Sequence, residues 1–252
     1  MNEIKMVVTD LDGTYLKNDK TVSEYTKRVT ETLRKRGIPF VIATARPIRA
    51  VAVDYDAGIF HNGAVLLNAS GKVLSIGVER PGAVISRILR ENPDCHIAAE
   101  AGDRLYANFD AERIWRGADY LYTSDFIEIG CAEADKIIIE TDGLEGMSRF
   151  QKYLSEDLYL QLSENTVAMI MNRRATKMNG IRRLAREYGI ETSEVAAFGD
   201  DYNDMEMLEG CGMGVAVDNA LKAVKAVADE RCESNENDGV ARWLAANIGL
   251  LK

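Results

Sequence analysis

The chain is poor in the residues that build several common kinds of site. It has only two histidines, His61 and His96, and four widely spaced cysteines that form no Cys-x-x-Cys pair. A histidine-rich metal site, a Ser-His-Asp triad, a zinc site and a disulfide framework are therefore all disfavoured. Any metal in this protein is expected to have oxygen ligands.

Long apolar runs and excess positive charge are also lacking. No stretch approaches the roughly 18 apolar residues that a membrane span needs, and the N-terminus lacks the apolar region of a signal peptide. The net charge of −9 leaves no basic excess for nucleic acid or an anionic membrane surface. We therefore expect a cytoplasmic protein with no nucleic-acid or membrane partner, whose oligomeric state the sequence leaves unknown.

What the sequence does contain is typical of an α/β protein. At 252 residues, 46% of them hydrophobic, the chain is long enough for one large domain or two smaller ones. An apolar run ends just before Asp10, a helix is predicted from an N-cap at Ser23 to about Arg36, and a second strand is predicted over 39–43. A strand, a helix and a strand in this order indicate a parallel sheet.

The pattern of predicted strands and helices changes twice along the chain. Over 80–175, short strands with turn residues alternate with helices, one of them predicted over Leu144–Glu156, which is typical of an α+β unit. The α/β rhythm then returns. We therefore predict a doubly wound, mostly parallel Rossmann-like α/β core made of 1–79 and 176–252, with an α+β domain of 80–175 inserted in it.

The first strand is followed by Asp10-Leu11-Asp12-Gly13-Thr14, which places two carboxylates two residues apart at the strand's carboxyl end. Ligands of open α/β sheets collect at this edge, so the two acids are well placed for chemistry. The same pattern also occurs in surface turns and in calcium loops, where Asp and Gly serve the backbone geometry. Taken alone, the motif leaves both interpretations open.

Further polar residues are predicted to reach the same edge. Thr44 follows the second strand, Lys177 precedes a predicted helix, and the loop Gly199-Asp200-Asp201-Tyr202-Asn203-Asp204 follows a later strand. Taken singly, Thr44 and the loop residues could merely cap helices, and Lys177 could be a solvated helix residue. Taken together, the acids need a compensating cation, and Mg²⁺ is the ion that suits oxygen ligands.

These residues, in this order, resemble the motifs of the haloacid dehalogenase superfamily of phosphotransferases. The first motif, Asp-x-Asp-Gly-Thr, is matched by 10–14, the second by Thr44, the third by Lys177 and the fourth by Gly199-Asp200-x-x-Asn203-Asp204. The α+β insertion between the second and third motifs is similar to that of the Cof-like branch of sugar-phosphate phosphatases. The segments Asn219-Ala220 and 238–241 are also similar to that branch.

The resemblance implies a role for each residue of the predicted site. Asp10 would be the nucleophile that forms an aspartyl-phosphate, and Asp12 the general acid and base, which requires its protonated form to be stabilised at neutral pH. Mg²⁺ would be bound by the carboxylates of Asp10 and Asp200 and by the carbonyl of Asp12. Asp204 would support the metal site or Lys177 from behind. The phosphate would be held by Thr44, Ala45, Lys177 and Asn203.

Three positions depart from the usual pattern of that branch. Ala45 stands where Gly usually follows the Thr, and Met178 stands where Gly usually follows the Lys. Alanine is acceptable after Thr44 unless the backbone there must adopt a positive φ. Asp201 replaces the more common Asn and adds negative charge near the expected metal.

The resemblance implies a Mg²⁺-dependent phosphomonoesterase acting on a small phosphorylated metabolite, a sugar phosphate in that branch. Two alternatives stay open: a phosphohexomutase that uses the same pair of aspartates, and a catalytically silent module that only binds phosphometabolites. A dehalogenase is disfavoured, because that chemistry needs neither an acid at Asp12 nor a metal at Asp200. The inserted domain would select the substrate, since the core edge recognises only phosphate.

The richest polar and aromatic stretch of the insertion offers a surface for a sugar or another ring. Its members are Arg104, Tyr106, Trp115, Arg116, Tyr120 and Tyr122. Large aromatic side chains are usually buried, so the same residues could instead form the core of the insertion. The sequence identifies neither the substrate nor the residues that contact it.

Overall fold

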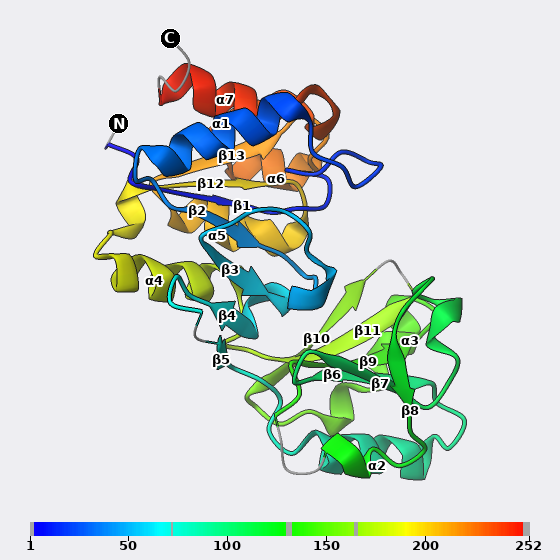
Figure 1. Ribbon diagram of the computed structural model, residues 1–252. Helices are drawn as coiled ribbons and strands as arrows, with labels where there is room; N and C mark the ends of the chain where they lie inside the picture. Colours follow the sequence, from blue (N-terminus) through cyan, green and yellow to red (C-terminus); the bar gives the residue numbers. More distant parts are fainter. Residues whose placement is uncertain (1–2, 72, 130–132, 164–165, 249–252) are drawn as a thin grey trace. The chain divides into compact units, whose positions relative to one another are not determined.

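A computed structural model describes residues 3–71, 73–129, 133–163 and 166–248 (Figure 1). The chain divides into two compact units. The first unit holds Met1–Arg46, Ala50–Val73 and Thr176–Lys252, and the second holds Pro47–Arg49 and Leu74–Ala175. Residues 74–79, expected in the core, lie in the second unit, where Val78 forms a β-bridge with Ala134.

The first unit is a doubly wound α/β fold with an eight-stranded sheet. In sheet order its strands are β14 (Glu230–Cys232), β13 (Met213–Val217), β12 (Val195–Gly199), β1 (Met6–Thr9), β2 (Phe40–Ala43), β3 (Ala57–Phe60), β4 (Val65–Leu67) and β5 (Val73–Ser75), whose last two residues are grouped with the second unit. The first six run parallel, and β4 runs antiparallel to β3. The predicted parallel sheet is therefore confirmed.

Helices cover both faces of this sheet (Figure 1). On one face α1 (Glu24–Lys35) packs against α7 (Gly239–Asn247). On the other face α4 (Lys177–Tyr188) packs against α5 (Met205–Gly210), and α6 (Lys222–Val227) lies beside α5. Because helices cover both faces, the central strands are apolar along their length, and every residue of β1, β2, β12 and β13 is buried.

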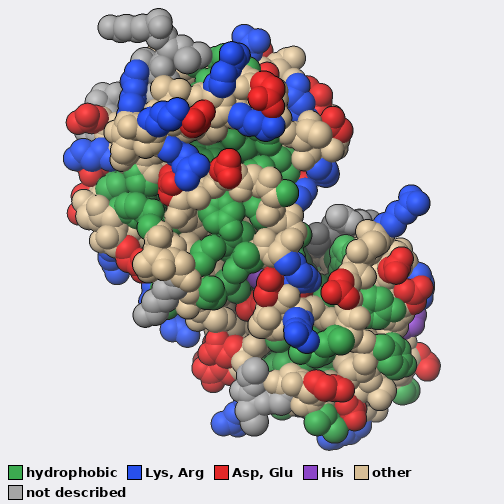
Figure 2. Space-filling view, in the orientation of Figure 1, with side chains coloured by type: hydrophobic (Ala, Val, Ile, Leu, Met, Phe, Trp, Pro, Cys, Tyr) green, Lys and Arg blue, Asp and Glu red, His purple; other side chains and the backbone are tan. Residues whose placement is uncertain are grey.

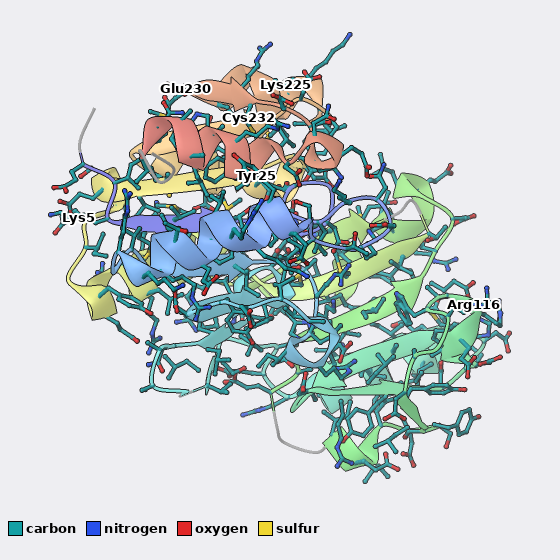
Figure 3. The ribbon with its side chains drawn as sticks, turned by 45° about the horizontal axis from the view of Figure 1, so that its top comes forward. Lys5, Tyr25, Arg116, Lys225, Glu230 and Cys232 are labelled. Carbon is teal, nitrogen blue, oxygen red and sulfur yellow. The ribbon has the colours of Figure 1, made fainter. Side chains whose placement is uncertain are left out.

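One helix cap and two side-chain contacts between separate segments place the two helices of the first face. Ser23 Oγ accepts a 3.1 Å hydrogen bond from the backbone N–H of Thr26, so α1 begins at its predicted cap. The guanidinium of Arg242 on α7 lies 5.8 Å from the ring centre of Tyr25 on α1 (Figure 3). Glu230 of β14 ties the same helix to the sheet edge, because it accepts a 2.7 Å hydrogen bond from Trp243 Nε1 (Figure 3).

The strand order reverses beside β1, which lies between β12 and β2. The chain runs outward through β2 and β3 on one side of β1, and later through β12, β13 and β14 on the other. Ligands of open α/β sheets bind at the carboxyl ends of the strands beside such a reversal. The loops that follow β1 and β12 therefore meet where this fold favours a site.

The second unit is an α+β fold with a six-stranded sheet. In sheet order its strands are β10 (Leu158–Ser163), β11 (Val167–Asn172), β9 (Lys136–Glu140), β6 (Ile97–Ala101), β7 (Arg104–Ala107) and β8 (Tyr120–Tyr122). The pair β7 and β8 is parallel, and the other neighbouring pairs are antiparallel. Residues of α2 (Pro81–Glu91) and α3 (Leu144–Ser148) join the strands in one hydrophobic core.

The single helix predicted over Leu144–Glu156 is wrong. The α-helix ends at Ser148, and a 3₁₀ turn covers Gln151–Tyr153. Side chains three residues apart lie on the same side of a 3₁₀ turn. This geometry lets Phe150 and Tyr153 both enter the core of the unit.

The surface carries charges of both signs. Figure 2 shows Lys and Arg side chains interspersed with Asp and Glu over the visible face of each unit. Among the residues that the structure describes, none of the helices has the length and apolar character needed to cross a membrane.

The second unit buries three ionisable side chains beside one another. The raised pKa of one of them leads us to predict that the stability of the protein depends on pH. Glu100, Asp135 and Lys136 are each less than a tenth exposed. Burial, followed by the neighbouring Glu100, raises the pKa of Asp135 to about 7. The folded protein then binds a proton that the unfolded chain releases, so stability falls as pH rises from about 4 to about 7 and stays lower above that.

We expect Asp135→Asn to remove this loss of stability. Relative to the wild type, the variant should gain more free energy of unfolding at about pH 8 than at about pH 5, as measured by urea denaturation at both pH values. Asp119→Asn, which changes an exposed acid of the same unit, is the control and should show no such difference. A gain for Asp135→Asn that is equal at the two pH values would contradict the prediction.

Candidate active site

A buried lysine joins two of the predicted carboxylates. Lys177 Nζ lies 2.6 Å from Asp10 Oδ1 and 2.6 Å from Asp204 Oδ1, and its side chain is 1% exposed. The cap of α4 places it, because Thr176 Oγ1 accepts the backbone N–H of Asn179 and Lys177 becomes the first helical residue. The alternative that Lys177 is a solvated helix residue is therefore wrong.

Asp204 holds the loop that follows β12. Its Oδ2 accepts backbone hydrogen bonds from Asp200 at 2.9 Å and Asp201 at 3.1 Å, while its Oδ1 accepts one from Lys177. Both carboxylate oxygens are thus engaged within the protein. Gly199 makes room for this arrangement, since a Cβ there would lie 2.4 Å from the Cβ of Asp204.

The loop after β1 reaches Asp200 through its last two residues. Thr14 Oγ1 donates a 2.6 Å hydrogen bond to Asp200 Oδ1. Gly13 has a φ of 82°, and a Cβ at this position would lie 2.4 Å from Asp200 Oδ2. Both the backbone angle and the close approach require glycine. The Gly and Thr of the first motif therefore bring its loop against Asp200.

Three carboxylates form a group that could hold a metal ion. Oxygens of Asp10, Asp200 and Asp204 lie within 4.8 Å of one another. Burial, with the nearby Asp204 and Asp200, raises the pKa of Asp10 to about 8, and burial raises that of Asp200 to about 6. Burial lowers the pKa of Lys177, but Asp10 and Asp204 outweigh it and raise that pKa, so the lysine stays charged.

The charges of this group fit a divalent cation. Three carboxylates and one ammonium leave two negative charges without a partner when all are ionised. The raised pKa values of Asp10 and Asp200 reflect this imbalance together with burial. A doubly charged cation with a preference for oxygen ligands, such as Mg²⁺, would offset it.

Asp12 lies in a different environment, between two cations. Arg46 donates to both of its oxygens, from Nε to Oδ2 at 2.6 Å and from Nη2 to Oδ1 at 2.6 Å, and Lys20 Nζ lies 2.7 Å from Oδ1. Burial raises the pKa of Asp12, but the hydrogen bonds from Arg46 and Lys20 outweigh burial and lower it. The expectation that its protonated form is stabilised at neutral pH is therefore wrong in this arrangement.

The expected phosphate-binding residues of the second and fourth motifs keep hydrogen-bonding groups at the same edge. Thr44 is buried after β2, and its Oγ1 accepts the backbone N–H of Arg46 at 3.1 Å, which leaves the hydroxyl hydrogen to be donated elsewhere. Ala45 lies next to it without a positive φ, so alanine fits here. Asn203 Nδ2 donates a 3.0 Å hydrogen bond to Asn62 Oδ1.

Several residues around the site had no predicted role. They are Thr14, Lys20, Arg46, Asn62 and Asn219, whose Nδ2 donates to Gly13 O at 2.7 Å. Arg46 and Asn62 carried usable signals, because Arg46 stands two residues after Thr44 and Asn62-Gly63 is a turn dipeptide shortly after the apolar pair Ile59-Phe60. Nothing in the local sequence marked Lys20.

The polar and aromatic stretch of the second unit is dispersed over several elements. Tyr106 of β7 packs against the hydrophobic core of the unit, so the core interpretation holds for this residue. Tyr120 Oη donates to Asp110 Oδ1 at 3.3 Å. Arg116 lies at the outside of the unit and points away from it (Figure 3).

A doubly wound core with these four motifs at its carboxyl edge defines a class of hydrolase. The family model described as haloacid dehalogenase-like hydrolase matches residues 7–244. The chain therefore belongs to the haloacid dehalogenase-like hydrolases, and the resemblance of its motifs to that superfamily is confirmed.

Relatives with known names match nearly the whole chain. The 5-amino-6-(5-phospho-D-ribitylamino)uracil phosphatase YitU of Bacillus subtilis is 29% identical, with 97% of this chain and 98% of that protein covered. YbjI of Escherichia coli, which is also named a 5-amino-6-(5-phospho-D-ribitylamino)uracil phosphatase, is 28% identical, with 94% of this chain and 93% of that protein covered. A haloacid dehalogenase-like hydrolase from Bacteroides thetaiotaomicron has the same fold, with a TM-score of 0.85, 24% identity and 97% and 99% of the two chains covered.

The buried lysine leads to a prediction about stability. Lys177→Met should lower the free energy of unfolding by roughly 3–5 kcal/mol, because it leaves Asp10 and Asp204 buried without their cation. Urea denaturation without divalent cations measures this effect. Added Mg²⁺ should recover part of the loss, because it restores positive charge to the carboxylates.

A surface lysine provides the control for this prediction. Lys35→Met removes a side chain that is 71% exposed and paired with Glu31, so its effect should stay below about 1 kcal/mol. Equal losses of stability in the two variants would show that the buried ion pairs do not carry the effect.

Proposed function

We propose that the protein is a Mg²⁺-dependent phosphomonoesterase that forms an aspartyl-phosphate on Asp10. The observation that carries this proposal is the buried cluster in which Lys177 holds Asp10 and Asp204 beside Asp200 at the carboxyl edge of the parallel sheet. The relatives YitU and YbjI are both named as phosphatases, which supports the same activity.

The proposed reaction has two displacements at phosphorus. In the first, a carboxylate oxygen of Asp10 attacks phosphorus, the ester P–O bond breaks, and Asp12 gives a proton to the departing alkoxide oxygen. In the second, water attacks the phosphorus of the aspartyl-phosphate and gives its proton to Asp12. The P–O bond to Asp10 then breaks, which releases orthophosphate and regenerates both carboxyl groups.

The ion pairs of Asp12 suit one of these steps better than the other. Its ionised form, held by Arg46 and Lys20, is ready to accept a proton from water. To donate a proton in the first step, Asp12 must first be protonated, which requires its ion pairs with Arg46 and Lys20 to weaken. A phosphate dianion that enters beside the two cations competes for them, which raises the pKa of Asp12 toward the value that an acid needs.

The acids of the site would have two different roles, either binding the metal directly or holding the groups that bind it. Mg²⁺ would be bound by the carboxylates of Asp10 and Asp200 and by the carbonyl of Asp12, and when bound it would offset negative charge on the phosphoryl oxygens. Asp204 would support this site from behind, because Lys177 and two backbone N–H groups already occupy its oxygens.

Neutral donors and one lysine would hold the phosphate. The spread charge of a transferring phosphoryl group needs donors that are already in place. The groups that we propose for this role are the Thr44 hydroxyl, the Ala45 backbone N–H, the Lys177 ammonium and the Asn203 side-chain amide.

The substrate that we propose is a small phosphate ester of a sugar or sugar alcohol. The names of YitU and YbjI specify a substrate with a phosphorylated ribityl group, and a phosphorylated ribityl group is a phosphate ester of a sugar alcohol. Selection of the substrate by the second unit stays a prediction. Phosphate release from a panel of phosphorylated sugars, sugar alcohols, nucleotides and pyridoxal phosphate would test the substrate class.

Removal of the nucleophile tests the mechanism. Asp10→Asn should lower the hydrolysis of p-nitrophenyl phosphate in Mg²⁺ by at least about a thousandfold, because the amide cannot form the acyl phosphate. Asp218→Asn changes an acid whose side chain is 76% exposed and should retain wild-type activity. Full activity of Asp10→Asn would contradict the proposed intermediate.

Removal of the metal tests the cofactor. EDTA should abolish the hydrolysis, and excess Mg²⁺ should restore it. Ca²⁺ should restore much less activity, because the larger ion prefers more ligands and longer oxygen distances than this compact group offers. Unchanged turnover in EDTA would exclude the metal from the mechanism.

A further inference from the structure

The turn that follows β3 has an unusual backbone. His61, Asn62 and Gly63 have φ angles of 49°, 56° and 112°, and all three residues are buried. A non-glycine residue in the left-handed region is strained, and such strain persists where the surrounding structure enforces it, often at functional sites. His61 and Asn62 are two such residues in succession, so contacts with the surrounding structure must hold this backbone conformation.

Backbone hydrogen bonds tie this turn to the loop of the second motif. The N–H of Asn62 donates to the carbonyl of Thr44 at 2.9 Å, and the N–H of His61 donates to the carbonyl of Arg46 at 3.2 Å. Two successive N–H groups of the turn are thus bonded to one neighbouring loop. Thr44 is therefore held both by β3, where its N–H donates to the carbonyl of Ile59 at 2.8 Å, and by this turn.

The same turn reaches the third and fourth motifs. A Cβ at Gly63 would lie 2.3 Å from the carbonyl oxygen of Thr176, so the turn packs directly on the residue that caps the helix of Lys177. The Asn62 side chain contacts the fourth motif, since its Oδ1 accepts the 3.0 Å hydrogen bond from Asn203 Nδ2. Residues from three motifs thus meet at one turn.

Asparagine satisfies two demands at position 62. It enters the left-handed region more readily than most residues, and its side-chain oxygen provides the acceptor for Asn203. Asn62 is 4% exposed, so the amide is held in a packed environment. Without this acceptor, the side chain of Asn203 would be free to rotate away from its present position.

We propose that Asn62 is a positioning residue for phosphate binding, which holds Thr44 through its backbone and Asn203 through its side chain. It acts through these two residues and not on the substrate itself. The inference rests on the proposed phosphatase function, in which Thr44 and Asn203 contact the phosphate.

The key variant is Asn62→Gly, because glycine keeps the left-handed turn and removes only the side-chain amide. We expect kcat/KM for p-nitrophenyl phosphate in Mg²⁺ to fall roughly 10- to 100-fold, as is typical when a residue behind a ligand-binding group is lost. The midpoint of urea denaturation should stay close to that of the wild type. The double variant Asn62→Gly/Asn203→Ala should be no less active than Asn203→Ala alone.

Asp238→Gly is a matched control in the same unit. Asp238 has a φ of 55°, and its Oδ1 accepts one 3.0 Å hydrogen bond, from Thr26 Oγ1, where α7 meets α1. This variant should retain wild-type kcat/KM, which would show that loss of a side-chain bond at a left-handed residue does not by itself lower activity.

The outcomes separate the inference from the function on which it rests. With an active wild type, unchanged kcat/KM in Asn62→Gly would overturn the positioning role and leave the proposed function intact. A loss that multiplies with that of Asn203→Ala would also overturn it, because Asn62 would then act independently of Asn203. A wild type that hydrolyses no phosphate monoester would contradict the proposed function and this inference with it.

Discussion

The arrangement of the carboxyl edge depends on one buried ammonium group. Lys177 lies within 2.6 Å of carboxylate oxygens of both Asp10 and Asp204, which belong to loops on neighbouring strands. Without that cation, three carboxylates within 4.8 Å of one another would repel in a poorly solvated environment. The lysine therefore allows the acids to gather, and the charge that it leaves unbalanced is what makes the group suited to a divalent metal.

Close packing of the backbone complements this electrostatic constraint. The reversal of strand order beside β1 brings the loops after β1 and β12 to the same place, and two glycines let them approach. Gly13 and Gly199 each stand where a Cβ would lie 2.4 Å from an aspartate side chain. The turn of His61–Gly63, whose own backbone has positive φ angles, donates two backbone hydrogen bonds to the loop of the second motif.

The carboxylates of the site differ in environment although two of them are only two residues apart. Burial and neighbouring acids raise the pKa of Asp10, whereas Arg46 and Lys20 lower the pKa of Asp12 against the effect of burial. Pairs of acids whose surroundings push their pKa values apart are typical of sites that divide nucleophilic and proton-transfer roles. Here, the charge of Asp12 is controlled by cations that a phosphate could also attract.

The order of the motifs, the parallel sheet and the gathering of Asp10, Lys177, Asp200 and Asp204 could be predicted from the chain alone, because strand periodicity and topology place such residues at one edge. The pairing of Asp12 with Arg46 and Lys20, the bond between Asn62 and Asn203, and the break after Ser148 could not. Asn62 and Asn203 are 141 positions apart, and local patterns carry no information about such contacts. Only the folded chain decides which charge meets which, because these contacts arise from long-range packing.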